Sequence, residues 1–165
     1  MRHFMNLLLA ALILGAPLSG CMPTSQFVNP ASKNYLEHPQ TSGPEMEANA
    51  SNGVLVLVTA AYAPPGNSSQ FSVYLSCTSN DEAAAELVEA HLLTDSGLSL
   101  TTNDHGLRCS ETTDAGRGFL HFRSDDVSRL IKQRSANLHL LLRVKGKMIA
   151  FSLPLHRKTV WVWPT

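Results

Sequence analysis

The sequence predicts a mainly β protein, a small antiparallel β-sandwich with one short helix, and leaves a two-layer α+β fold as the alternative. From Gly53 onward, short segments rich in β-branched and aromatic residues recur at close spacing, which is typical of sandwich strands. Turn residues, such as the Pro-Pro-Gly-Asn run at 64–67, separate them. The 165 residues are 44% hydrophobic and 16% charged, which suits one modest domain with appendages and excludes a fully disordered chain.

Seven or eight short strands are expected. Residues 54–62 form a continuous apolar run, and residues 71–78 alternate Phe, Val, Leu and Cys with Ser and Tyr. Residues 138–144 and 148–153 flank a Lys-Gly-Lys turn and predict a hairpin. The other expected strands are a segment starting near Leu87 and residues 98–102, 118–123 and 160–163.

The segment 82–94 is ambiguous. Ala84, Leu87, Val88 and His91 have helical spacing, whereas the turn residues at 94–97 favour a hairpin. We expect a strand from about Leu87.

One helix of about ten residues is expected after residue 124. Residues 124–126 offer an N-cap and an acidic first turn, a narrow apolar stripe follows, and two basic residues lie near the C-terminus. The stripe is Val127, Leu130 and Ile131, and the basic residues are Lys132 and Arg134.

Residues 1–20 are expected to be a secretory signal peptide. A basic start precedes an apolar run at 7–14, which is about half the roughly 20 residues that a membrane-spanning helix needs. The ending Leu18-Ser19-Gly20-Cys21 resembles the lipobox of bacterial lipoproteins. The resemblance implies removal of residues 1–20 and acylation of Cys21, and Met22 after it implies sorting to the outer membrane, facing the periplasm. An ordinary cleaved signal peptide is the alternative.

Residues 21–52 are expected to be a lipidated N-terminus and flexible tether, and residues 53–165 the β-sandwich domain. The tether segment is rich in Pro, Ser, Thr and Asn with few apolar residues. A second interpretation makes residues 27–36 a docking peptide for a partner.

With Cys21 acylated, one pair of cysteines remains. Cys77 and Cys109 are expected to form a disulfide, because the compartment implied by the signal peptide is oxidising. Two buried thiols are the alternative, and the absence of a CxxC pattern argues against redox activity.

Charge is divided along the chain. Residues 21–116 contain two basic and eleven acidic residues, whereas residues 117–165 contain ten basic and two acidic residues. This asymmetry suggests a basic face for an anionic partner, such as lipid A phosphates, an acidic protein or translocating nucleic acid. Overall neutrality argues against a general nucleic-acid binder, and no nucleic acid is expected. Alternatively, the two halves neutralise each other locally. The candidate binding residues are Arg143, Lys145, Lys147, Arg157 and Lys158.

The C-terminal Val-Trp-Val-Trp run adds Trp161 and Trp163 to the candidate binding residues. Both point the same way along a strand, so they form either a binding platform or part of the core.

Catalytic and metal-binding patterns are mostly missing. No HExxH, GxSxG, Walker or GxGxxG pattern occurs. A three-histidine zinc site from His91, His121 and His139, and a hydrolase triad containing Asp104 and His105, are minor alternatives. We expect no enzyme activity, no cofactor and no metal.

The sequence therefore suggests a non-enzymatic outer-membrane lipoprotein that binds an envelope protein complex. Its architecture is similar to that of small accessory lipoproteins of secretion, pilus or conjugation machines, an analogy at the level of the fold. A periplasmic inhibitor or a glycan- or small-ligand-binding module is the alternative.

Overall fold

A computed structural model describes residues 22–30, 50–64, 69–79, 85–102, 107, 109–110 and 116–162. The chain divides into two compact units. The larger, Ser25–Thr159, is the β domain; the smaller comprises Met1–Thr24 and Val160–Thr165, of which residues 22–24 and 160–162 are described. The signal peptide and Cys21 lie outside the described residues. No helix in the described ranges is long and apolar enough to cross a membrane.

The described part contains nine strands and a helix of one turn. They are β1 (Met22–Val28), β2 (Ala50–Ser51), β3 (Val54–Tyr62), β4 (Gln70–Ser79), β5 (Ala85–Thr94), β6 (Ser99–Thr102), β7 (Arg117–Arg123), α4 (Val127–Leu130), β8 (Ser135–Val144) and β9 (Lys147–Val162). They form one sheet in the order β6-β5-β8-β9-β1-β3-β4-β7, and β2 pairs with β3.

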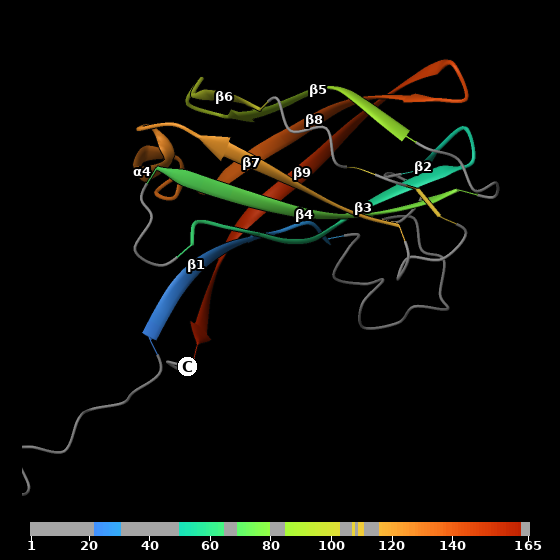
Figure 1. Cartoon of the computed structure of the whole chain (residues 1–165). Helices are drawn as coiled ribbons and strands as arrows, with labels where there is room; N and C mark the ends of the chain where they lie inside the picture. Colours follow the sequence, from blue (N-terminus) through green and yellow to red (C-terminus); the bar gives the residue numbers. More distant parts are fainter. Residues whose placement is uncertain are drawn as a thin grey trace, which may run out of the picture. The chain divides into compact units, whose positions relative to one another are not determined.

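The sheet of the β domain curls until its two end strands meet. Figure 1 shows β5 and β6 on one side of the domain and β3 and β4 on the other. The Thr102 hydroxyl of β6 donates a hydrogen bond of 2.8 Å to the His121 carbonyl oxygen of β7, so the sheet is nearly closed. The predicted mainly β, antiparallel class is confirmed, and the α+β alternative is wrong because the described helix is too short to form a layer.

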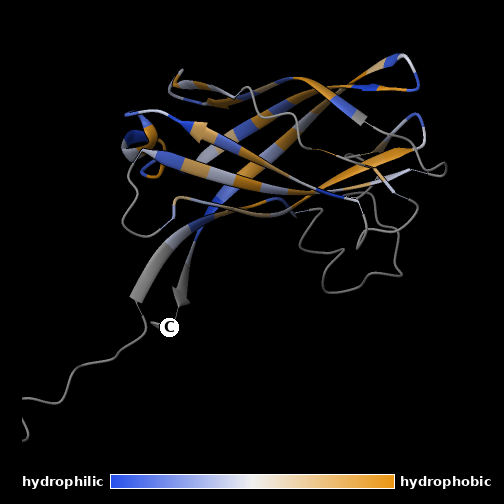
Figure 2. Cartoon of the chain, in the orientation of Figure 1, coloured by the Kyte–Doolittle hydropathy of each residue, from blue (hydrophilic) through white to orange (hydrophobic). Residues whose placement is uncertain are grey.

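Alternation along the strands builds the core. In β7, Gly118, Leu120 and Phe122 are buried between more exposed neighbours, and Figure 2 shows hydrophobic and hydrophilic residues alternating along β4, β7 and β8. Successive side chains of a strand point to opposite faces, so each strand has an inner and an outer row. The strand from near Leu87 and the predicted strands 54–62, 71–78, 98–102 and 118–123 are confirmed, with small shifts at their ends.

Two-residue turns fix two of the hairpins. Lys145 and Gly146 have φ of 51° and 76°, and Asn52 and Gly53 repeat these values. Two successive residues with positive φ are typical of the type I′ turn that joins antiparallel strands. The predicted hairpin at Lys145–Lys147 is confirmed by the pairing of Val144 with Lys147.

The expected flexible tether is wrong for β1 and β2. Phe27 is 1% exposed and packs edge-on against Phe71 with ring centroids 5.5 Å apart. The Asn29 amide donates a hydrogen bond to the Pro154 carbonyl oxygen of β9. Although residues 21–52 are mostly polar, they contain strand β1, which lies between β9 and β3 in the sheet. Phe27 therefore docks on its own domain.

The expected ten-residue helix is also wrong, since α4 has four residues. Val127 and Leu130 are fully buried, and one turn suffices to bury them. After it, the Arg157 guanidinium donates to the carbonyl oxygens of Ile131 and Lys132 at 3.2 and 3.1 Å. These bonds satisfy carbonyl groups at the helix end, where the chain turns into β8. The expected separate strand 160–163 is likewise corrected, because β9 runs without a break from Lys147 to Val162.

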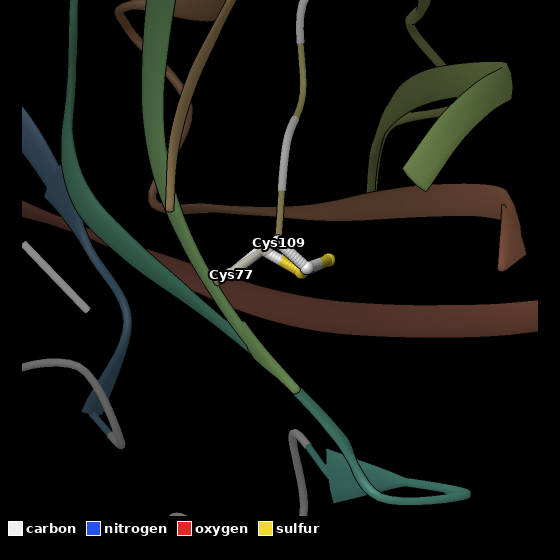
Figure 3. The surroundings of a disulfide bond; sticks show 2 residues. All are labelled: Cys77 and Cys109. Carbon is white, nitrogen blue, oxygen red and sulfur yellow. A yellow bond between two sulfur atoms is a disulfide. The ribbon is translucent and has the colours of Figure 1, made fainter. Parts of the chain in front are cut away.

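The predicted disulfide between Cys77 and Cys109 is present, with a Cα–Cα distance of 4.5 Å. Figure 3 shows it joining β4 to the segment that carries Cys109. Beside it, the Ser110 amide donates to the Cys77 carbonyl oxygen and the Ser79 amide donates to the Ser110 carbonyl oxygen. The bond thus fastens this segment along β4.

Candidate functional site

The outer side of β3, β4 and β7 carries a row of rings. We call this surface the aromatic face and define it by Tyr62, Tyr74, Phe119, His121 and the two arginines that end β7, Arg117 and Arg123. The strand register places these residues together: Tyr74 lies opposite Phe119, and Ser72 lies opposite both Tyr62 and His121.

The rings are in contact from β3 to β7. Tyr62 stacks on Tyr74 with centroids 5.9 Å apart, Tyr74 lies 6.5 Å from Phe119, and Phe119 lies 5.3 Å from His121. Phe119 is 52% exposed and Tyr74 37%. Their inward neighbours Leu120 and Val73 are fully buried, so the core does not need these outer rings. A contiguous exposed aromatic surface is typical of a binding site.

Tyr74 also influences the titration of the Tyr62 phenol. A hydrogen bond with Tyr74 is the main cause that raises the pKa of Tyr62 above its usual 10.0, and burial adds to it. The Tyr62 phenol therefore stays neutral at physiological pH, and the face offers hydroxyl groups beside apolar ring surface.

One end of the aromatic face is polar. The His121 Nδ1 lies 3.0 Å from the Ser72 hydroxyl and 3.2 Å from the Gln70 amide nitrogen, which fixes the plane of the imidazole. Beyond it, a surface hollow of about 500 Å³ is lined by Ser69, Gln70, Arg123, Ser124 and Asp125. Because Gln70 lies opposite Arg123 in the register, this hollow continues the aromatic face.

The predicted binding residues of the β8–β9 hairpin lie on the other half of the sheet. Arg143 forms an ion pair of 2.6 Å with Glu86 of β5. Lys145 and Lys147 are exposed at the adjacent turn. We call the outer side of β5, β8 and β9 the paired face; its defining residues are Glu86, Glu89, His91, His139 and Arg143.

The remaining predicted binding residues lie far along β9. Arg157 is ten residues from Lys147, about 33 Å at the rise of a strand, and its guanidinium caps the carbonyl groups after α4. Lys158 beside it is exposed. The candidate cations are thus divided between the two ends of β9 and do not form one cluster. The Trp161 backbone belongs to β9, and Trp163 lies outside the described residues.

The expected alternative of a three-histidine zinc site is wrong. His91 lies opposite His139 across β5 and β8, but His121 is on β7 and bonded to Ser72. Across the described ranges, no three His, Cys, Asp or Glu residues come together as metal ligands would. Asp104 and His105 lie outside these ranges, and the expectation of no enzyme activity stays a prediction.

Comparison with known proteins assigns no family. The chain matches no protein-family model, and no curated protein is similar to it in sequence. Among solved structures, the crystal structure of the yeast GGA1 GAE domain is similar over 69% of this chain and 95% of that one, with 10% identity and a TM-score of 0.29.

Proposed function

We propose that the chain is a lipid-anchored, non-enzymatic binding protein of the bacterial envelope and that its aromatic face contacts a protein partner. The lipobox-like ending at Cys21 supports the anchor. The disulfide between Cys77 and Cys109 suits the oxidising periplasm that such an anchor implies. Within this proposal the partner belongs to an outer-membrane assembly, for which secretion, pilus or conjugation machines are the candidates.

The contiguous row of exposed Tyr74 and Phe119 and half-buried His121 is the single observation that carries the binding site. Aromatic and arginine side chains dominate the binding energy of protein interfaces. Val88, Leu93 and Met148 are exposed apolar residues on β5 and β9, but Leu93 lies opposite Asn137 and Met148 lies opposite Arg143. These two positions are six residues apart along β8, about 20 Å. Single apolar side chains at a surface need no partner.

Photo-crosslinking in cells tests this assignment. A photoreactive phenylalanine analogue replaces Phe119 in the full chain, and the captured proteins are identified by mass spectrometry. The matched control carries the same analogue at Leu93, which is also exposed, on the paired face. We expect one envelope protein to be captured from position 119 and not from position 93. Capture of the same abundant proteins from both positions contradicts the proposal.

A glycan- or small-ligand-binding module is the second candidate. It is favoured by the hollow beside Arg123, where an amide, hydroxyl groups and a cation lie next to the rings. Titration with soluble peptidoglycan fragments distinguishes the two functions. Saturable binding that Phe119→Ala abolishes, together with no protein captured from position 119, selects this candidate.

A further inference from the structure

Charge on the aromatic face has one sign. Arg117 and Arg123 are exposed at the two ends of its edge strand. None of the described residues that point outward from β3, β4 and β7 is Asp or Glu. The three strands therefore combine cations and rings without a described carboxylate of their own, and Asp125 lines the adjoining hollow.

Four of the five described carboxylates are engaged elsewhere. Glu86 pairs with Arg143 and Asp126 with Arg129. Glu89 contacts His91, and Asp95 accepts a hydrogen bond from Ser135. Asp125 lines the hollow but forms no ion pair with Arg123. Consequently the Arg123 guanidinium has no hydrogen-bond or ion-pair partner among the described residues.

The spacing on β7 sets the pattern that a ligand must match. Phe119 and Arg123 lie on the same side of the strand, four residues apart, which corresponds to about 13 Å. An extended polypeptide repeats the same distance between its own residues i and i+4. A partner segment running along β7 can therefore place an apolar side chain on the rings and a carboxylate at Arg123.

We propose that the aromatic face binds an extended acidic segment of a protein, with an aromatic or large aliphatic side chain on Tyr74 and Phe119 and a carboxylate at Arg123. This inference rests on the proposed function and specifies the partner's chemistry. The planar guanidinium suits a carboxylate, which it can bind through two parallel hydrogen bonds. The Gln70 side chain opposite Arg123 also lines the hollow, where its amide nitrogen contacts His121 Nδ1.

Selection from a random peptide display library tests the proposal on the full chain in detergent, with the Phe119→Ala chain used for counter-selection. We expect the enriched peptides to carry an aromatic or aliphatic residue and Asp or Glu at i+4. Changing that carboxylate to the amide, or Arg123→Glu in the protein, should weaken binding by about tenfold or more. Arg143→Glu on the paired face is the matched control and should leave the affinity unchanged.

Three other outcomes would overturn the inference of an acidic partner segment. Phe119-dependent peptides without a carboxylate, or acidic peptides that bind Arg123→Glu equally well, overturn this inference and leave the proposed function standing. Arg123-dependent binding to phosphatidylglycerol vesicles without any selected peptide assigns the cation to a lipid phosphate and also overturns it. The crosslinking from position 119 tests the proposed function separately, so the failure of one is distinguishable from the failure of the other.

Discussion

The aromatic face and the paired face are built by the same alternation of strands, yet they present different chemistry. On the paired face, Glu86 meets Arg143 and Glu89 meets His91 across or along the strands. On the aromatic face, rings meet rings and Arg123 meets no described carboxylate. Charge in a stretch of sequence is therefore a poor guide to a binding surface, because the residue across the strand decides whether that charge is already satisfied.

The two halves of the sheet are also secured differently. The half with the aromatic face has a covalent bond, since Cys77 of β4 is linked to Cys109. The other half relies on the long β8–β9 hairpin and on Arg157, which caps the turn after α4. Strand β1 lies between β9 and β3 and joins both halves.

The largest loss of stability is expected from removing the Phe27 side chain of β1, the strand that joins the two halves of the sheet. Phe27→Ala empties a site that is 1% exposed and in contact with Phe71, and we expect the free energy of unfolding to fall by about 3–5 kcal/mol. Because β1 joins the halves, both faces should be lost in one transition. Denaturant unfolding followed by tyrosine and tryptophan fluorescence measures this, with the half-buried neighbour Val28→Ala as control. If Phe27→Ala lowered the free energy of unfolding no more than Val28→Ala, β1 would act as a tether and not as a structural strand of the domain.

Removing the disulfide should affect the two halves unequally. A bond between residues separated by 32 positions contributes about 3 kcal/mol in the loop-entropy model. In Cys77→Ala with Cys109→Ala we expect that loss of stability, and faster hydrogen exchange at β4 and β7 than at β8 and β9. Exchange by mass spectrometry measures the difference. Equal acceleration in both halves would show that the bond supports the whole sheet and not mainly the aromatic half.

Much of this fold could be predicted because alternation identifies strands and their buried sides. In Gln70–Ser79, for example, the alternating apolar residues of the sequence are the buried ones: Phe71, Val73, Leu75 and Cys77. Strand β1 escaped prediction because a single buried Phe27 among prolines and polar residues carries no periodic signal. Its position depends on docking between β9 and β3, which local composition does not encode.

Each of the two faces escaped prediction in part because one of its strands contains a β-bulge. The register shifts between Val58 and Ala60 in β3, and between Leu87 and Glu89 in β5. Without these shifts the two-residue period would place Tyr62 in the core with Val58, and Glu89 and His91 beside Leu87. One sequence signal did indicate the aromatic face: Phe119 lies among the outward residues of a strand whose inward residues, Leu120 and Phe122, are apolar.

The ion pair on the paired face should contribute little to stability. Arg143 and Glu86 are both about half exposed, so Glu86→Gln should lower the free energy of unfolding by less than about 1 kcal/mol and remove part of its dependence on salt. Arg123→Gln should leave both quantities unchanged, because Arg123 has no described partner. Thermal unfolding at low and high ionic strength compares the two variants. A larger loss from Arg123→Gln would reveal a structural role for this cation and weaken its assignment to a partner.

The smallest expected effect concerns the hydroxyl groups of the aromatic face. The hydrogen bond with Tyr74 raises the pKa of Tyr62, so Tyr74→Phe should lower that pKa toward 10.0. In the wild type, stability from this shift is fully present below the unfolded pKa and is lost as pH rises through the higher folded pKa. Tyrosine ¹³C NMR over alkaline pH follows the titration, with Phe119→Leu as the control that leaves both hydroxyls in place. An unchanged Tyr62 pKa in Tyr74→Phe would mean that burial, and not the hydroxyl contact, controls it. The rings would then be joined by stacking alone, and the aromatic face would offer a partner two independent hydroxyl groups.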